Sequence, residues 1–170
     1  MKKSLTFLKV LKKDKVQFII NKLEDLYPKI TPPLDHENDY TLLVAVLLSA
    51  NSTDKSVNKI TPVLFKKANS PKKMVKLSRD EIYKIIKPCG LGPAKSLNIL
   101  KLSKIVLDKY DGKIPKDINE LEKLPGVGHK TASVVASQAF GIPAFAVDTH
   151  VHRLMYRWGL SNGKNVVKQR

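Results

Sequence analysis

The chain has 170 residues, which suits one domain or two small ones. Its hydrophobic fraction of 42% is enough for a packed core and excludes an intrinsically disordered chain. The 31 Lys and Arg residues outnumber the 15 Asp and Glu residues and give a formal net charge of +16, which indicates a polyanionic partner such as nucleic acid or an anionic membrane surface. Almost all of the basic residues are lysine, and a lysine bias also arises from genome composition and solubility, so charge alone leaves both explanations open.

Neither a membrane span nor a secretion signal is predicted. No apolar run is long enough to cross a bilayer, and residues 42–50 (LLVAVLLSA) fit a buried helix. The basic start, MKKSLTFLKVLKKDK, lacks the apolar core and the cleavage site of a signal peptide. Cys89 is the sole cysteine, so no disulfide forms within the chain. We expect a cytoplasmic, bacterial protein that acts as a monomer.

Apolar residues recur at helical spacing along most of the chain, and capping residues precede several of these segments. Asp39 is expected to cap a very apolar helix, and Thr53 or Asp54 to cap the helix after it. In chain order, the first expected helices cover 14–27, 40–50 and the residues from the Thr53 or Asp54 cap to Ala68. A short helix then begins at Pro71, and another follows Ser78. A long helix runs from the turn at 87–95 to Tyr110, and two more cover 117–124 and about 128–140.

Residues 141–147 (GIPAFAV) are the one segment that fits a strand, and one strand forms no sheet. An amphipathic helix follows, with Val151, Leu154, Met155 and Trp158 on one face. The sequence contains no internal repeat. It therefore predicts an all-α protein made of many short helices joined by turns.

Residues 124–132 (LPGVGHKTA) place two glycines between two helical segments, and three explanations compete. A P-loop needs Gly-x4-Gly-Lys-Ser/Thr after a strand, whereas Gly126 and Gly128 are close together and follow a helix, so we reject it. The second explanation is a helix–turn–helix corner in which glycine supplies a positive φ. In the third, the bare turn also lets a phosphate backbone reach the unpaired N–H groups that begin the second helix. The Leu-Pro-Gly-Val-Gly pattern favours the third, a phosphate contact that reads no base.

Lys130 lies in the first turn of the second helix. The commoner role for such a lysine is a phosphate counter-charge. The alternative is a nucleophile, because the positive end of a helix and partial burial both disfavour the ammonium form of an amine. A nucleophilic lysine needs a nearby carboxylate, and Asp148 follows at a loop–helix junction. Asp148 is either an ordinary N-cap or a carboxylate that faces the same groove as Lys130.

Asp148, His150 and His152 alternate as ligands on a strand would, which raises the question of a metal site. On a helix, residues two apart point to different sides, and the apolar periodicity after Val151 indicates a helix. We therefore expect no shared metal ion and interpret both histidines as surface or phosphate-contacting groups.

Several of these stretches resemble one known family. Residues 124–153 (LPGVGHKTASVVASQAFGIPAFAVDTHVHR) closely resemble the helix-hairpin-helix and Gly/Pro…Asp signature (HhH-GPD) of endonuclease III-type DNA glycosylases. LLSANSTDKSVNK (47–59), CGLGPAKSLNI (89–99) and NGKNV (162–166) are also similar to that family, in the same order and spacing. The resemblance covers about residues 15–170.

The resemblance implies an all-α protein with two lobes and a DNA groove between them. A six-helix bundle at 32–142 would carry the hairpin, and residues 1–31 with 143–170 would form a second lobe that is incomplete in this chain. The implied activity is the excision of oxidised pyrimidines, followed by strand cleavage at the abasic site. The implied partner is double-stranded DNA with damaged bases or abasic sites.

The resemblance also implies roles for individual residues. Lys130 matches the catalytic lysine, whose amine attacks C1′ of the deoxyribose, displaces the base and forms a Schiff base that undergoes β-elimination. Asp148 matches the aspartate that activates this lysine and offsets positive charge on the sugar. The damaged base leaves the stack, Leu91 fills the gap as an apolar wedge, and Asn51 contacts the orphaned base. The other expected DNA contacts are Gly126 and Gly128, through backbone amides, and Val127, His129, Thr131 and His150.

Two departures from the family pattern stand out. Asn51 replaces the usual glutamine and is one methylene shorter. The family ends in four cysteines that hold a 4Fe–4S cluster, whereas Cys89 lies far from that region and one thiol cannot hold such a cluster. We therefore expect no cofactor within this chain, and the cluster only in the complete family protein. The final residues, GKNVVKQR, look like the first turns of a helix without a C-cap, so we expect the sequence to be part of a longer protein.

Two other functions stay open. One is a non-catalytic DNA-binding module that uses the same hairpin. The other is a monofunctional glycosylase that excises mispaired bases without cleaving the strand. Such relatives often carry another residue at position 130, so Lys130 argues against this second alternative.

Overall fold

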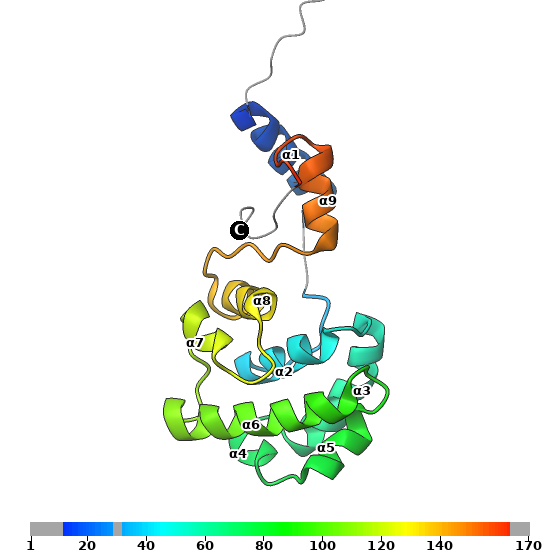
Figure 1. The fold of residues 1–170 in the computed structure, drawn as a ribbon, viewed down its shortest axis with the longest axis vertical. Coiled ribbons are helices and arrows are strands. Elements are labelled where there is room, and N and C mark those ends of the chain that lie inside the picture. Colours follow the sequence, from blue (N-terminus) through cyan, green and yellow to red (C-terminus); the bar gives the residue numbers. More distant parts are fainter. Residues whose placement is uncertain (1–11, 29–31, 164–170) are drawn as a thin grey trace, which may run out of the picture. The chain divides into compact units, whose positions relative to one another are not determined.

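The computed structural model describes residues 12–28 and 32–163, and all regular secondary structure in these ranges is helical (Figure 1). The all-α prediction is therefore confirmed. Within the described ranges the helices are α1 (Lys12–Leu26), α2 (Asp39–Ser49), α3 (Asp54–Lys67), α4 (Pro71–Met74), α5 (Arg79–Ile86), α6 (Gly92–Tyr110), α7 (Ile118–Glu122), α8 (His129–Phe140) and α9 (Thr149–Arg157).

Side-chain caps begin most of these helices, largely as predicted. Helix α2 is the exception, because Asn38 caps it and the expected cap, Asp39, is its first residue. The Asn38 side chain accepts a hydrogen bond from Thr41 N at 3.0 Å, and Thr41 Oγ1 accepts one from Asn38 N at 2.9 Å. This reciprocal pair requires a side chain at the third helical position that reaches back, and Thr41 supplies it only when Asn38 is the cap. Thr53 caps α3, as predicted, and Ser70, Ser78 and Asp117 cap α4, α5 and α7.

The described chain falls into two compact units. One contains α1 and α9, and the other, residues 32–148, contains α2 to α8. The boundary differs from the predicted one, because residues 143–148 belong with the unit of α2 to α8. Val147 is 7% exposed and Asp148 lies beside Lys130, which ties this segment to that unit. The assignment of the units as family lobes stays a prediction.

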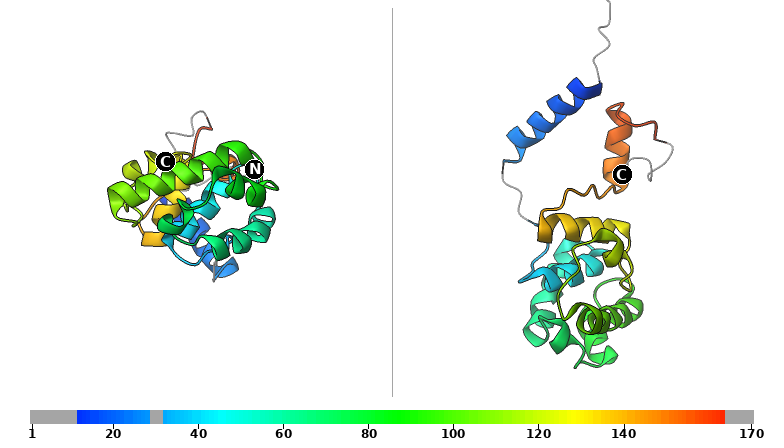
Figure 2. Two further views of the ribbon diagram at one scale, coloured as in Figure 1. Left: turned by 90° about the horizontal axis from the view of Figure 1, so that it is seen from below. Right: turned by 90° about the vertical axis from the view of Figure 1, so that its left-hand side faces the viewer.

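Helix α2 is the centre of the larger unit. Figure 1 shows it between α8 and α6, and it contacts both, as well as α3. The two further views in Figure 2 show the same packing from below and from the side. Because α2 is apolar on every side, it suits a central position. Its buried residues are Tyr40, Thr41, Leu42, Leu43, Val44, Ala45, Val46, Leu47 and Leu48.

Buried polar bonds fix the two ends of α2 to α6. At the first end, Tyr40 Oη lies 2.6 Å from Ser103 Oγ, which itself donates to Ile99 O at 2.5 Å. Since the Ser103 hydrogen is used in that second bond, the Tyr40 hydroxyl is the donor of the first. Burial raises the pKa of Tyr40, so it remains a phenol. At the second end, Lys95 Nζ donates to Leu48 O at 2.8 Å.

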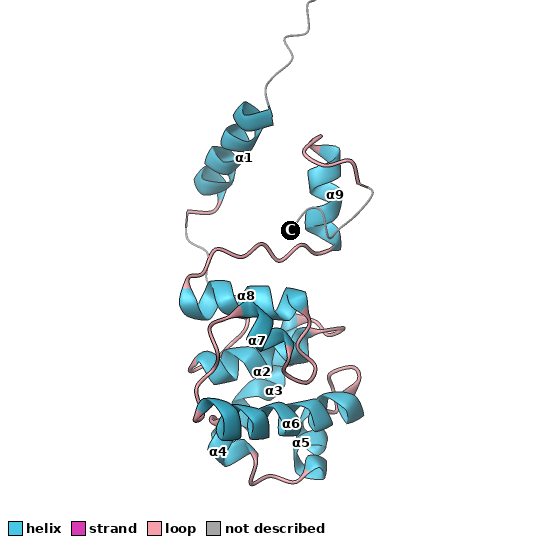
Figure 3. Cartoon of the chain, turned by 60° about the vertical axis from the view of Figure 1, so that its left-hand side comes forward, coloured by secondary structure: helices cyan, strands magenta, loops and turns pink. Residues whose placement is uncertain are grey.

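Residues 141–148 connect α8 to α9 without helix or strand (Figure 3), so the one segment that fitted a strand forms none. Gly141 ends α8 with φ 63°, and its N–H donates back to Ser137 O at 3.0 Å. Such a left-handed C-cap turns the chain out of the helix. The connection then brings Asp148 to the start of α9.

The smaller unit contributes few buried side chains. Neither α1 nor α9 has a buried residue, and on α1 Phe18 is 64% exposed and Leu26 is 67% exposed. Leu160, after α9, is 9% exposed. Across the ranges that the structure describes, no helix combines the length and the apolarity needed to cross a bilayer.

Candidate active site

Helices α7 and α8 and the turn between them form the hairpin that the glycine pattern predicted. Leu121, Leu124 and Val127 are buried and anchor the hairpin in the core. Gly126 has φ 79°, and a Cβ there would lie 2.7 Å from Asn98 Nδ2, so only glycine fits. Because the Val127 side chain is buried, this residue can offer DNA only its backbone.

Gly128 serves a different purpose from Gly126. Its φ of −92° and ψ of 173° are open to any residue, so conformation does not require glycine here. A Cβ on Gly128 would meet nothing within 4 Å, and no side chain caps the start of α8. No side chain of the described residues therefore covers the first N–H groups of α8, which lie at the positive end of the helix dipole. This is the arrangement expected of a phosphate contact.

Polar contacts fasten the hairpin to the bundle. Glu120, on α7, accepts hydrogen bonds from Tyr110 Oη at 2.6 Å, Lys109 Nζ at 2.9 Å and Lys123 Nζ at 2.5 Å. The hydrogen bonds from Lys123, Tyr110 and Lys109 lower the pKa of Glu120 to about 2. The carboxylate therefore stays ionised and links α7 to the end of α6.

A second contact spans the hairpin itself. His129 Nδ1, at the start of α8, lies 2.5 Å from Glu122 Oε1, at the end of α7. Since an ionised carboxylate can only accept, the histidine Nδ1 carries the hydrogen. This leaves the Nε2 side of the His129 ring as the part that could meet a phosphate.

The structure brings Lys130 and Asp148 together. Their Nζ and Oδ2 atoms are 3.5 Å apart, with side chains 58% and 32% exposed. The partial burial expected of Lys130 is therefore wrong. Exposed ion pairs contribute only about 0–1 kcal/mol to stability, so the fold gains little from this pair. An amine next to a carboxylate that can accept its proton is the arrangement a nucleophilic lysine needs.

Lys130 and Asp148 border a pocket of about 410 Å³ that lies within the larger unit. Three parts of the chain form it: the residues before α2, the junction of α2 and α3, and one face of α8 with Asp148. Asn51 and Thr131, both predicted DNA contacts, also line it. The remaining lining residues are Pro33, Leu34, Val46, Ser49, Ala50, Asp54, Val134 and Gln138.

Sequence reasoning missed most of this lining. Val134 and Gln138 follow Lys130 by about one and two helical turns, so helical periodicity could have placed them on its face. Asp54 was considered only as a helix cap. Pro33 and Leu34 had no signal, because they come from a linker that only the tertiary fold brings to α8.

Asn51 and Leu91, the two residues expected to enter a duplex, lie on loops that touch. Both have left-handed backbone, with φ 56° and 62°, which is uncommon outside glycine. A Cβ on Gly90 would lie 3.0 Å from Asn51 O, so the two loops pack backbone to backbone. The Leu91 side chain is 60% exposed. An exposed leucine on a constrained backbone fits an apolar wedge.

His150 lies in the other unit, on α9, and is exposed. Its Nδ1 accepts a hydrogen bond from Arg153 Nη2 at 3.1 Å. His150 and His152 are both part of helix α9, as the apolar periodicity predicted. Within residues 12–28 and 32–163, no three His, Cys, Asp or Glu side chains are grouped closely enough to hold a metal ion.

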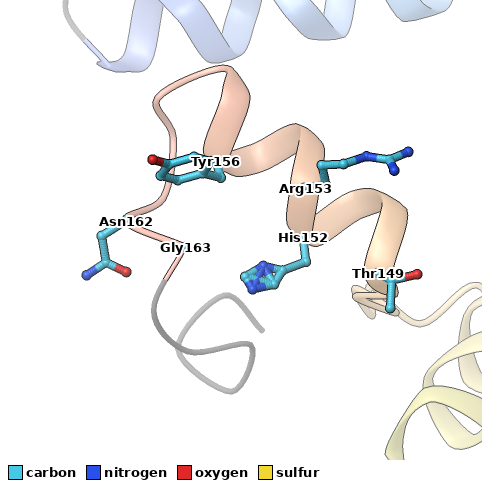
Figure 4. A pocket seen from close by; sticks show the side chains of 6 residues that line it. All are labelled: Thr149, His152, Arg153, Tyr156, Asn162 and Gly163. Carbon is cyan, nitrogen blue, oxygen red and sulfur yellow. The ribbon is translucent and has the colours of Figure 1, made fainter.

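A second pocket, of about 490 Å³, lies wholly within the unit of α9 (Figure 4). His152 and Tyr156 project into it from the helix, and Asn162 and Gly163 come from the turn that follows. Gly163 has φ 70°, and a Cβ there would lie 2.8 Å from the Tyr156 ring. The pocket contains no carboxylate or amine pair like that of Lys130 and Asp148; its other lining residues are Thr149 and Arg153.

The described residues do not fit an iron–sulfur cluster. The one thiol, Cys89, is 1% exposed and is packed in the hydrophobic core before α6. A 4Fe–4S cluster needs four cysteine thiolates. Cys89 therefore takes part in packing.

The family model and the curated relatives that match this chain agree with one another. The model of the HhH-GPD superfamily of base excision DNA repair proteins matches residues 44–170. Endonuclease III of Bacillus subtilis (strain 168) is 45% identical over 152 residues, which are 89% of this chain and 69% of that protein. Endonuclease III of Escherichia coli (strain K12) is 45% identical over 148 residues, or 87% of this chain and 70% of that protein.

Solved structures agree with these relatives. A non-covalent complex of an endonuclease III with DNA superposes with a TM-score of 0.87 at 41% identity, covering 94% of this chain and 74% of that chain. A trapped covalent endonuclease III–DNA intermediate superposes with a TM-score of 0.86 at 42% identity, covering 93% of this chain and 74% of that chain.

Proposed function

Since the chain belongs to the HhH-GPD superfamily of base excision DNA repair proteins, we propose that it is a bifunctional DNA glycosylase and abasic-site lyase. One observation carries the proposal for this chain's own residues: Lys130 Nζ and Asp148 Oδ2 lie 3.5 Å apart at the edge of a pocket. The pair lies at the start of the helix whose open N-terminal end suits a DNA phosphate.

Lys130 is the nucleophile in this proposal. Its neutral amine attacks C1′ of the deoxyribose, the N–C1′ bond forms, and the bond from C1′ to the base breaks with the electron pair leaving on the base. Asp148 accepts the proton that the amine loses and offsets positive charge that develops on the sugar. The C1′–O4′ bond then breaks, O4′ takes the electron pair and a proton, and a Schiff base forms between Nζ and C1′. Removal of a proton from C2′ then expels the 3′ phosphate oxygen and breaks the strand.

The hairpin and the two touching loops hold the DNA for this reaction. The N–H groups at the start of α8 bind a phosphate next to the lesion, which positions the strand without reading sequence. The damaged base leaves the stack and Leu91 occupies the gap, while Asn51 meets the orphaned base. The loops that carry Asn51 and Leu91 touch, since a Cβ on Gly90 would lie 3.0 Å from Asn51 O, which supports a shared role at the gap.

Oxidised pyrimidines in double-stranded DNA are the proposed substrates. The pocket beside Lys130 offers a hydroxyl from Ser49, a carboxylate from Asp54 and an amide from Gln138. These groups supply both donors and acceptors for the edge of an extruded base. The net charge of +16 favours a polyanionic partner. The proposed protein acts as a monomer in a bacterial cytoplasm, and this chain itself holds no cofactor.

Borohydride trapping tests the proposal. The protein is incubated with duplex DNA that contains an abasic site, and borohydride reduces any Schiff base to a stable protein–DNA adduct. We expect the parent and a Lys104→Ala control, altered at an exposed lysine of α6, to form the adduct, and Lys130→Ala to bind DNA without forming it. Trapping by Lys130→Ala at the parent rate would remove Lys130 from the mechanism.

Base release and strand cleavage on duplexes with an oxidised or a mispaired base, measured beside the trapping, separate the alternative functions. A non-catalytic DNA-binding module would bind the duplex, release no base and form no adduct. A monofunctional glycosylase would release a mispaired base without an adduct and without strand cleavage. The bifunctional enzyme gives base release, adduct and cleavage together.

A further inference from the structure

Lys95 is a buried cation that the proposed reaction does not use. It lies in the first turn of α6 and is 4% exposed, and lysine is almost never so buried unless its ammonium is paired. Its Nζ donates to Leu48 O at 2.8 Å, Ala50 O at 2.5 Å and Ser52 Oγ at 3.1 Å. These bonds use all three hydrogens of the ammonium group.

The acceptors of Lys95 lie where α2 ends. Helix α2 ends at Ser49 with Ala50 as its C-cap, and the last carbonyls of a helix have no intrahelical partners and carry the negative end of the helix dipole. A cation is favoured there. Burial lowers the pKa of Lys95, however, so the position costs free energy that an exposed capping lysine would not.

Lys95 holds the residues on both sides of Asn51, Ala50 through its backbone carbonyl and Ser52 through its side-chain hydroxyl. Ala50 and Ser52 are both bonded to its Nζ, and Asn51 between them has φ 56°. A residue other than glycine keeps a left-handed conformation only where its surroundings determine it. The bonds to Ala50 and Ser52 supply that restraint, together with the turn bond from Ser52 N to Ser49 O at 3.0 Å.

Lys95 also holds the Leu91 loop through its own backbone. Its N–H donates to Leu91 O at 3.0 Å, which is the first intrahelical bond of α6 and joins Lys95 to the residue whose φ is 62°. Gly90 completes the link, because a Cβ there would lie 3.0 Å from Asn51 O. One residue therefore bonds to both loops, 50–52 and 90–92, which we call the gap-filling loops.

We propose that Lys95 is a positioning residue that locks the two gap-filling loops into one rigid unit, so that Asn51 and Leu91 enter a duplex together. The proposal rests on the proposed function for the roles of Asn51 and Leu91. It assigns Lys95 no contact with DNA and no part in the chemistry at Lys130. Its effect is expected only where a gap in a duplex must be filled.

A probe without Schiff-base chemistry tests the proposal. The probe is a duplex with a tetrahydrofuran abasic analogue opposite 2-aminopurine, whose fluorescence changes when the base is unstacked. The proteins are the parent, Lys95→Met, which keeps the length of the side chain and removes its donors, and Lys104→Met as the exposed control on α6. Lys95→Met is expected to need about tenfold more protein for the same fluorescence change, and Lys104→Met to match the parent.

A double-mutant cycle distinguishes positioning from a general loss of stability. If Lys95 acts through the gap-filling loops, Asn51→Ala weakens the parent but has little further effect in Lys95→Met. Equal effects of Asn51→Ala in both backgrounds, or a Lys95→Met variant that matches the parent, would overturn the proposal. So would a parent that gives no fluorescence change with the probe.

A second variant covers the case in which Lys95→Met does not fold. Ser52→Ala removes one acceptor of the Lys95 ammonium from a partly exposed position. A smaller shift in the same direction is expected, and no shift overturns the proposal. Failure of the proposed function is recognised separately, since the parent would then give the fluorescence change but no borohydride adduct with a natural abasic site.

Discussion

The substitution Asp148→Asn separates a catalytic carboxylate from an ordinary surface ion pair. Asparagine keeps the shape and one acceptor oxygen but cannot take a proton from Lys130. The Nζ–Oδ2 distance of 3.5 Å, with side chains 58% and 32% exposed, places the pair in a water-like medium. Coulomb's law at the dielectric constant of water then gives about 1 kcal/mol for the pair, in line with the about 0–1 kcal/mol that exposed ion pairs contribute.

The expected catalytic loss is much larger than that. A positioned general base contributes about 100- to 10,000-fold to a rate, which corresponds to about 3–5 kcal/mol. Asp148→Asn should therefore lower the single-turnover rate of base release by at least about 100-fold, while urea unfolding changes by no more than about 1 kcal/mol.

Single-turnover release of base from a duplex with one oxidised pyrimidine, at saturating protein, gives the rate, and unfolding in urea gives the stability. Asp108→Asn is the control, because this exposed carboxylate on α6 lies outside the pocket. A loss below about fivefold for Asp148→Asn, which corresponds to about 1 kcal/mol, would be accounted for by the ion pair alone and would refute its role as a base. A loss in stability as large as the loss in rate would refute it as well.

Three other predictions concern the hairpin and the wedge. Gly126→Ala should lower the free energy of unfolding by about 1–2 kcal/mol or more, because φ is 79° and the new Cβ meets Asn98. Gly128→Ala should lower it by less than about 1 kcal/mol but should weaken DNA binding. Equal losses of stability in urea unfolding would contradict the separate roles of the two glycines. Glu120 has a pKa of about 2 against 4.5 for a free glutamate, so its contribution to stability is present above pH 4.5 and is lost as the pH falls towards 2. The stability of Glu120→Gln should therefore fall less than that of the parent over this pH range. Identical profiles of stability against pH for the two proteins would contradict the role of the Glu120 carboxylate. Leu91→Ala should change urea unfolding by less than about 0.5 kcal/mol, since the side chain is 60% exposed, and should reduce the 2-aminopurine response; an unchanged response would exclude Leu91 as the wedge.

Local sequence signals predicted most of the helices. Ser70, Ser78 and Asp117 cap their helices where expected, because a short polar side chain followed by a helical apolar pattern is a local signal. Asn38 and Asp39 are both good caps, and the choice between them depends on Thr41 reaching back. Residues 141–147 fit a strand by composition but form none, because an apolar stretch without a pairing partner has no ladder to join.

The candidate site was predictable only in part. The hairpin glycines and Lys130 could be found in one continuous stretch, and the family resemblance pointed to Asp148. The pocket could not be predicted, because Leu34 and Asn51 come from other parts of the chain and meet α8 only through packing. Lys95 gave no signal at all, since a lysine in a lysine-rich sequence is expected on the surface.

Peptide mapping of the reduced protein–DNA adduct tests the central claim most directly. After borohydride trapping, the DNA is digested to a sugar remnant and the protein is cleaved into peptides for mass spectrometry. The proposed mechanism predicts the added mass on Lys130, in the peptide that begins the second helix of the hairpin. The added mass on any other lysine, Lys95 included, or on the N-terminal amine would contradict it.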